Sequence, residues 1–152
     1  MATSKSLTPK KKYFTVQEAN KALPLVKAIV SDIVRQNRTV TELQQRLSAV
    51  VTEHRRPSSD PYTEELAHSQ AALEVEQTKL VEYVDELTKL GVELKGDDGL
   101  CDFYSLMDGR EVYLCWRLGE PEVSHWHELS AGIAGRQPLS TTVGPRGGHR
   151  VR

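Results

Sequence analysis

The apolar residues in the first half of the chain recur every three or four positions, which is the spacing of one face of a helix. After a break rich in proline and serine, leucines return every seven positions. The two sets predict two helices of roughly 25 residues, each about 38 Å long, that pair as an antiparallel coiled-coil-like hairpin. The first set is Val26, Ile29, Ile33, Gln36, Val40, Leu43, Leu47 and Val50, all apolar except Gln36, and the second is Leu66, Leu73, Leu80 and Leu87.

Residues at the helix ends refine this prediction. Thr15 and Glu18 have the spacing of a capping box, in which each side chain binds a free backbone N–H at the start of a helix. Pro24 lacks an N–H, so we expect a short helix over 15–22 and a kink or restart at the proline. Gly91 is expected to end the second helix. The helical hairpin is therefore predicted to span residues 15–90.

After Gly91 the hydrophobic period changes to two, which is typical of strands. Residues 92–100 predict a short strand and a turn, and Asp108-Gly109 is a favoured two-residue turn for a β-hairpin. Counting outward from this turn places Phe103 opposite Leu114. One face of the hairpin is then apolar and is expected to face the core: Cys101, Phe103, Val112, Leu114, Trp116 and Leu118.

Together these patterns predict an α+β fold, mostly α, in which a long helical hairpin carries a C-terminal β-hairpin head. We expect one domain over residues 13–139, with the head and its closing segment at 92–139. The ends, 1–12 and 140–152, are basic and are expected to be disordered. Because a helical hairpin buries only one stripe on each helix, its flanks need cover from the C-terminal segment or from a second copy that completes a four-helix bundle. We expect both, so the protein is predicted to be a homodimer.

Composition and charge indicate the cellular location of the protein and the partners it could contact. The chain has 152 residues and a net charge of −1, but its two ends carry lysine and arginine without acids, so they could contact nucleic acid. No apolar run is long enough to span a membrane, and the N-terminus lacks the apolar core of a signal peptide. A cytoplasmic location is therefore expected, with Cys101 and Cys115 as reduced thiols.

The candidate chemistry lies in one short stretch near the carboxyl end. If Val123 to Glu128 is extended, His125 and His127 point to the same side, and Glu128 follows directly. Two imidazoles at this spacing could bind a transition metal or heme, with Glu128, Glu120 or Glu122 available nearby. Further ligands could come from His54, His68, Asp102 or a second subunit. The competing interpretation is that His127 is a buried imidazole with hydrogen-bond partners only.

Three further residues are candidates for ligand binding. Trp116 and Trp126 offer aromatic surface, and Arg136 could hold a carboxylate or phosphate through two hydrogen bonds. Alternatively, Arg136 could fasten the C-terminal loop to Glu111 or Glu128. The leading hypothesis is a binding protein for a partner protein, a small ligand or a metal. Nucleic-acid binding through the tails and a small enzyme with His127 as general base are alternatives.

Three motifs, YFTVQEANKALP, DGREVYLCWRLGEPEV and WHELSAGIAGRQPL, resemble an uncharacterised bacterial family, domain of unknown function 2203. The resemblance covers about residues 13–139 and implies no established activity. His127, Glu128 and Arg136 fall inside the motifs, whereas the family usually has an aromatic residue at the position of His125. The resemblance therefore favours His127 with Glu128 over the pair of histidines.

Overall fold

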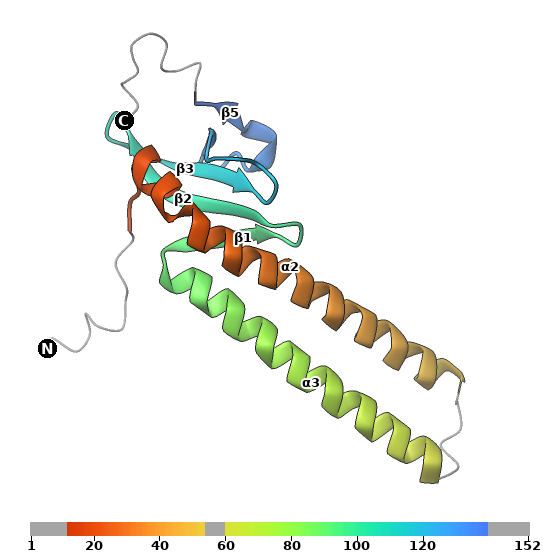
Figure 1. Cartoon of the computed structure of the whole chain (residues 1–152). Helices are drawn as coiled ribbons and strands as arrows, with labels where there is room; N and C mark the ends of the chain where they lie inside the picture. Colours follow the sequence, from red (N-terminus) through yellow and green to blue (C-terminus); the bar gives the residue numbers. More distant parts are fainter. Residues whose placement is uncertain (1–11, 54–59, 140–152) are drawn as a thin grey trace, which may run out of the picture.

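The computed structural model describes residues 12–53 and 60–139, and it contains a helical hairpin joined to an antiparallel sheet (Figure 1). The fold class is α+β, mostly α, as the sequence predicts. The sheet has five strands in chain order, so each strand pairs with the next along the sequence. The elements are α2 (Val16–Glu53), α3 (Asp60–Lys89), β1 (Val92–Gly96), β2 (Leu100–Met107), β3 (Arg110–Arg117), β4 (His125–Glu128), the 3₁₀ turn η1 (Ile133–Gly135) and β5 (Gln137–Pro138).

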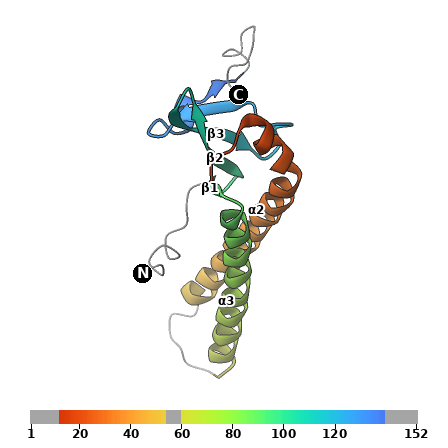
Figure 2. The ribbon, with the colours of Figure 1, turned by 90° about the vertical axis from the view of Figure 1, so that its left-hand side faces the viewer.

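The two long helices lie side by side and antiparallel, with the sheet at one end of the pair (Figures 1 and 2). The first turns of α2 lie against the sheet, and the rest of α2 pairs with α3. Gln36 lies within the first apolar series and Glu76 lies between Leu73 and Leu80 of the second, and the structure brings these two polar residues together. The Gln36 side-chain amide donates to the Glu76 carboxylate at 2.7 Å and to its carbonyl at 2.9 Å. This polar contact favours one alignment of the two helices.

The start of α2 confirms one prediction and corrects another. The capping box forms, because the Thr15 N–H donates to Glu18 and the Glu18 N–H donates to the Thr15 hydroxyl, each at 3.0 Å. The expected break at Pro24 is wrong, since one continuous helix passes through it. The proline is exposed, while Leu23 and Val26 on either side are buried. Packing of this apolar face offsets the hydrogen bond that the proline cannot make.

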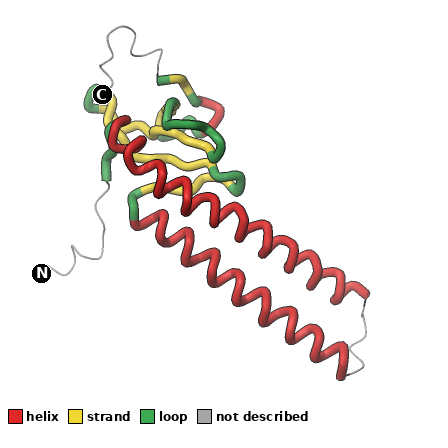
Figure 3. Tube along the Cα trace, in the orientation of Figure 1, coloured by secondary structure: helices red, strands yellow, loops and turns green. Residues whose placement is uncertain are grey.

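The β-hairpin has the predicted turn and register. Asp108 and Gly109 have φ angles of 55° and 78°, as this turn requires. Phe103 lies opposite Leu114, and Cys101 lies opposite Trp116. Figure 3 shows the strands in yellow at the head of the molecule. The strand over 92–96 is also present, and α3 ends just before Gly91, whose φ is 93°.

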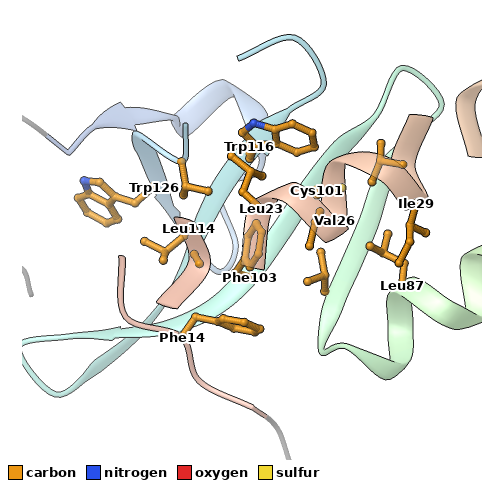
Figure 4. Close-up of a cluster of buried hydrophobic side chains, with 14 of the residues drawn as sticks. Phe14, Leu23, Val26, Ile29, Leu87, Cys101, Phe103, Leu114, Trp116 and Trp126 are labelled. Atoms are coloured by element: carbon orange, nitrogen blue, oxygen red, sulfur yellow. The ribbon is translucent and has the colours of Figure 1, made fainter. Parts of the chain in front are cut away.

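One face of the sheet, here called the inner face, packs against α2 and the end of α3 (Figure 4). Phe103, Leu114 and Trp116 are fully buried there, together with Leu87 at the end of α3. The strand residues predicted to face the core all belong to this cluster or pack against it. Burying such side chains contributes about 1.5–3 kcal/mol each, which makes the inner face the main source of stability in the head.

The segment before α2 fastens the chain to the middle of the sheet. The Phe14 N–H donates to the Tyr104 carbonyl at 2.8 Å, and the Ser105 hydroxyl donates to the Phe14 carbonyl at 2.6 Å. Farther along, the Val123 N–H donates to the Asn20 side chain at 2.7 Å. The basic tails expected at 1–12 and 140–152 lie outside the described residues, apart from Lys12. No helix in the described ranges is long and apolar enough to cross a membrane.

Candidate functional site

The opposite face of the sheet, here called the outer face, carries polar and aromatic side chains. Strand pairing arranges them in two neighbouring rows, because side chains on one face occupy every second position of a strand. The first row is Glu93, Asp102, Cys115 and His125. The second row is Tyr104, Tyr113 and His127. Several members are nonetheless buried: Asp102 is 2% exposed, His127 is 3% exposed and Cys115 is fully buried.

His127 is held by hydrogen bonds at both ring nitrogens. Its Nδ1 lies 2.7 Å from the Glu128 carbonyl oxygen, and its Nε2 lies 3.0 Å from Asp102 Oδ1. A carbonyl oxygen can only accept a hydrogen bond, so Nδ1 must carry the proton and donate it. In a neutral imidazole, Nε2 then presents its lone pair to the Asp102 carboxylate. The ring also lies beside Tyr113, with centroids 5.3 Å apart.

The second oxygen of Asp102 faces a cation. Lys95 Nζ lies 3.6 Å from Asp102 Oδ2 and 3.2 Å from Glu93 Oε1. The same ammonium group lies over the Tyr113 ring, 4.5 Å from its centroid. One carboxylate oxygen of Asp102 therefore contacts the imidazole of His127, and the other faces the ammonium group of Lys95.

Cys115 lies next to Asp102 on the neighbouring strand. Burial and the nearby Asp102 carboxylate raise the pKa of the Cys115 thiol to about 11, although contacts from Arg136 oppose the increase. Arg136 Nε donates to the Cys115 sulfur at 3.2 Å, and its Nη2 donates to the Cys115 carbonyl at 3.3 Å. This cysteine is therefore a protonated thiol at neutral pH.

Arg136 fastens the C-terminal segment, but not to the acids expected from the sequence. Its guanidinium group binds both carboxylate oxygens of Glu120, at 2.9 and 2.7 Å. Partial burial alone would raise the pKa of Glu120, but hydrogen bonds from Arg136 and the Arg117 backbone outweigh it, so the pKa is lowered. The expected pairing of Arg136 with Glu111 or Glu128 is wrong, because the turn after β3 brings Glu120 closer.

The structure brings together only some of the six candidate residues from the sequence, which are His125, His127, Glu128, Trp116, Trp126 and Arg136. His127 and His125 share the outer face, as expected, but Glu128 alternates to the inner side, where it pairs with Arg110. His125 is half-buried, with Nδ1 3.1 Å from the Ser124 hydroxyl oxygen. The remaining three residues of this set lie as follows: Trp116 is in the core, Trp126 lies on the inner face, and Arg136 contacts Cys115.

A different set of possible metal ligands lies close together. Ligand atoms of Asp102, Cys115 and His127 are all within 4.8 Å of one another, and all three residues are buried. The sequence placed His127 at the site and gave Asp102 as one possible further ligand, but it gave Cys115 only as a reduced thiol. The signal that could have found them is the hairpin register, which pairs Asp102 with Cys115, followed by placing β4 beside β3.

The fold and this cluster define a class of protein: a helical hairpin bearing an antiparallel sheet, with a buried polar cluster on the face away from the helices. The chain belongs to the family described as "Uncharacterized conserved protein (DUF2203)", whose model matches residues 12–139. This match confirms the resemblance noted in the sequence, and it assigns no activity. No curated protein and no solved structure matches the chain.

Proposed function

We propose that the head of this protein binds one transition metal ion of the zinc type through Asp102, Cys115 and His127. The observation that carries the proposal is the contact between His127 Nε2 and Asp102 Oδ1 at 3.0 Å. Since Nδ1 donates to a carbonyl, both atoms of this contact are acceptors when the imidazole is neutral and the carboxylate ionised. Such a contact requires a cation between them, either a proton or a metal ion.

The groups around the contact between His127 and Asp102 favour a metal ion over a proton. Imidazole nitrogen, thiolate sulfur and carboxylate oxygen are the ligands that zinc prefers in proteins. A metal-binding histidine usually donates its other N–H to a carbonyl or carboxylate, as His127 does to the Glu128 carbonyl. Arg136 would remain close to the Cys115 sulfur and balance the negative charge of its thiolate. A buried ionic pair is costly without a function or a structural gain, and metal binding supplies both.

The same geometry bears on the alternative functions. A general base must reach a proton on a substrate, but His127 is 3% exposed and both its nitrogens are engaged. The enzyme hypothesis is therefore less favoured than metal binding. The nucleic-acid hypothesis depends on the two basic tails, which lie almost entirely outside the described residues.

Cobalt(II) provides a direct test, because a cysteine ligand gives a sulfur-to-cobalt charge-transfer absorption and a tetrahedral site gives intense visible bands. Metal-free protein should bind one Co²⁺ with both signals, and Zn²⁺ should displace the cobalt. Cys115→Ser should abolish the charge-transfer band. Cys101→Ser is the matched control, because Cys101 is equally buried on the neighbouring strand but faces the core. Its spectrum should match that of the wild type.

His127→Ala and Asp102→Asn should each weaken binding at least tenfold, as removal of a metal ligand does. Far-ultraviolet circular dichroism of each variant checks that it is folded. If the folded wild type takes up no cobalt or zinc in equilibrium dialysis, the proposal is wrong. It is equally wrong if Cys101→Ser loses the charge-transfer band and Cys115→Ser keeps it.

We also propose that the protein is a homodimer formed through the helical hairpin. Leu43, Leu47, Leu66 and Leu73 belong to the apolar series of the two helices, yet each remains partly exposed within one chain. A second hairpin packed along this stripe would cover them, as in a four-helix bundle. Light scattering after size exclusion should give twice the mass of the 17.0 kDa chain. A monomer at micromolar concentration would contradict this proposal.

A further inference from the structure

We infer that Lys95 is a built-in counter-cation of the proposed metal site, and that an incoming divalent cation must displace its ammonium group from Asp102. This inference rests on the proposed function. It makes Lys95 a residue that sets the affinity of the site without being a ligand.

Three contacts place the Lys95 ammonium group at the boundary of the cluster. Nζ lies 3.6 Å from Asp102 Oδ2, 3.2 Å from Glu93 Oε1 and 4.5 Å from the centroid of the Tyr113 ring. Each of these partners attracts a cation: two are carboxylates, and the third is the face of an aromatic ring. Glu93 also accepts a hydrogen bond from the Tyr113 hydroxyl at 3.3 Å, which links two of them.

The two oxygens of Asp102 therefore have different partners. Oδ1 faces His127 inside the cluster, and Oδ2 faces Lys95 toward the outside. A divalent ion bound to this carboxylate would place two positive charges a few ångströms from the ammonium group. At that distance the repulsion is large in a poorly solvated site, so the metal-bound state favours withdrawal of Lys95.

The lysine is able to withdraw. Its side chain is 37% exposed, whereas that of Asp102 is 3% exposed, so the ammonium group can move into solvent while the carboxylate stays. The long flexible side chain of lysine makes such a movement inexpensive. Arg136, the other cation at the cluster, is held by two hydrogen bonds to Glu120 and has less freedom to move.

Lys95→Gln tests the inference, because it removes the charge but keeps a polar side chain of similar length. Zn²⁺ affinity measured by competition with a chelating dye should rise roughly tenfold, the direction expected when a nearby like charge is removed. Lys95→Arg keeps the charge and should bind within about twofold of the wild type. Lys89→Gln is the matched control, because Lys89 pairs with Asp85 on α3, and it should leave the affinity unchanged.

Equal or weaker zinc binding by Lys95→Gln would overturn the inference while leaving the metal site itself intact. An increase of the same size in Lys95→Arg would also overturn it, because the effect would then not depend on charge. Failure of the proposed function gives a different result, since neither the wild type nor any of these variants would compete with the dye.

Discussion

The two faces of the sheet are made from the same strands but have opposite characters. On the inner face, Phe103 and Leu114 pack with α2 residues in an apolar core. On the outer face, one position along each strand, Asp102 and Cys115 are just as buried but are surrounded by polar groups. Alternation of side chains therefore separates the residues that stabilise the head from the residues of the proposed metal site.

Burial also has opposite energetic consequences on the two faces. Apolar side chains on the inner face gain stability directly from burial. On the outer face, burial of Asp102 and His127 costs free energy, and the contact between them recovers only part of that cost. Apolar residues in place of Asp102 and His127 would stabilise the protein equally well. The presence of these two polar residues is therefore better explained by a function than by stability.

The largest effect should come from the inner face. Phe103→Ala removes a fully buried ring and should lower the free energy of unfolding by about 3–5 kcal/mol, since it leaves a cavity in the core. Tyr104→Ala, one position along the same strand but partly exposed on the outer face, should cost only about 1 kcal/mol. Urea unfolding followed by circular dichroism measures both. Equal losses would contradict the assignment of stability to the inner face.

The buried pair on the outer face should give the next largest effect in metal-free protein. Asp102→Ala and His127→Ala should each cost about 3 kcal/mol, because each leaves a buried polar group without its partner. The double variant should cost less than the two single losses together, by about 1–3 kcal/mol. A double-mutant cycle with a chelator present measures this coupling. Additive losses would mean that the two side chains act independently.

The two thiols should have no effect at neutral pH, and they should affect stability only in alkaline solution. Burial raises the pKa of Cys101 to about 12 and that of Cys115 to about 11, from about 9 for an unfolded thiol. Above about pH 9 the unfolded chain therefore releases thiol protons that the folded chain keeps, so the free energy of unfolding should fall as the pH rises toward 11. Below pH 9 the two thiols should add no pH dependence.

Serine variants separate the contributions of the two faces. Cys101→Ser should flatten the alkaline decline more than Cys115→Ser does, because the pKa of the inner-face thiol is raised further. Arg136 accounts for part of this difference, since its contacts lower the pKa of Cys115. Unfolding curves measured at several pH values provide the comparison. Identical slopes in the wild type and both variants would show that neither thiol titrates differently in the two states.

Local sequence signals predicted much of the fold. Thr15 and Glu18 marked the start of α2, and Asp108-Gly109 fixed the turn and the register of β2 with β3. These features depend on residues close together in the chain, whose geometry is set by a few hydrogen bonds. The break expected at Pro24 was wrong because burial of the neighbouring positions outweighs a local preference.

The candidate site was harder to predict because its contacts cross between strands. His127 meets Asp102 across β3, twenty-five positions away in the sequence, and Arg136 meets Glu120 sixteen positions away. The sequence placed His127 and Arg136 in the right region, but choosing their partners required the position of β4 beside β3. No local pattern fixes that position, since the linker between these strands has no turn motif as specific as Asp108-Gly109.

The contact between Phe14 and Tyr104 has a consequence for synthesis of the chain. Ninety residues separate the two, so the amino-terminal part of α2 emerges from the ribosome long before the sheet that covers it. Until then, its stripe of leucine, isoleucine and valine is open to other chains, and long-range contacts of this kind slow folding. Newly made protein should therefore depend on chaperones until the sheet has been translated and can cover this stripe.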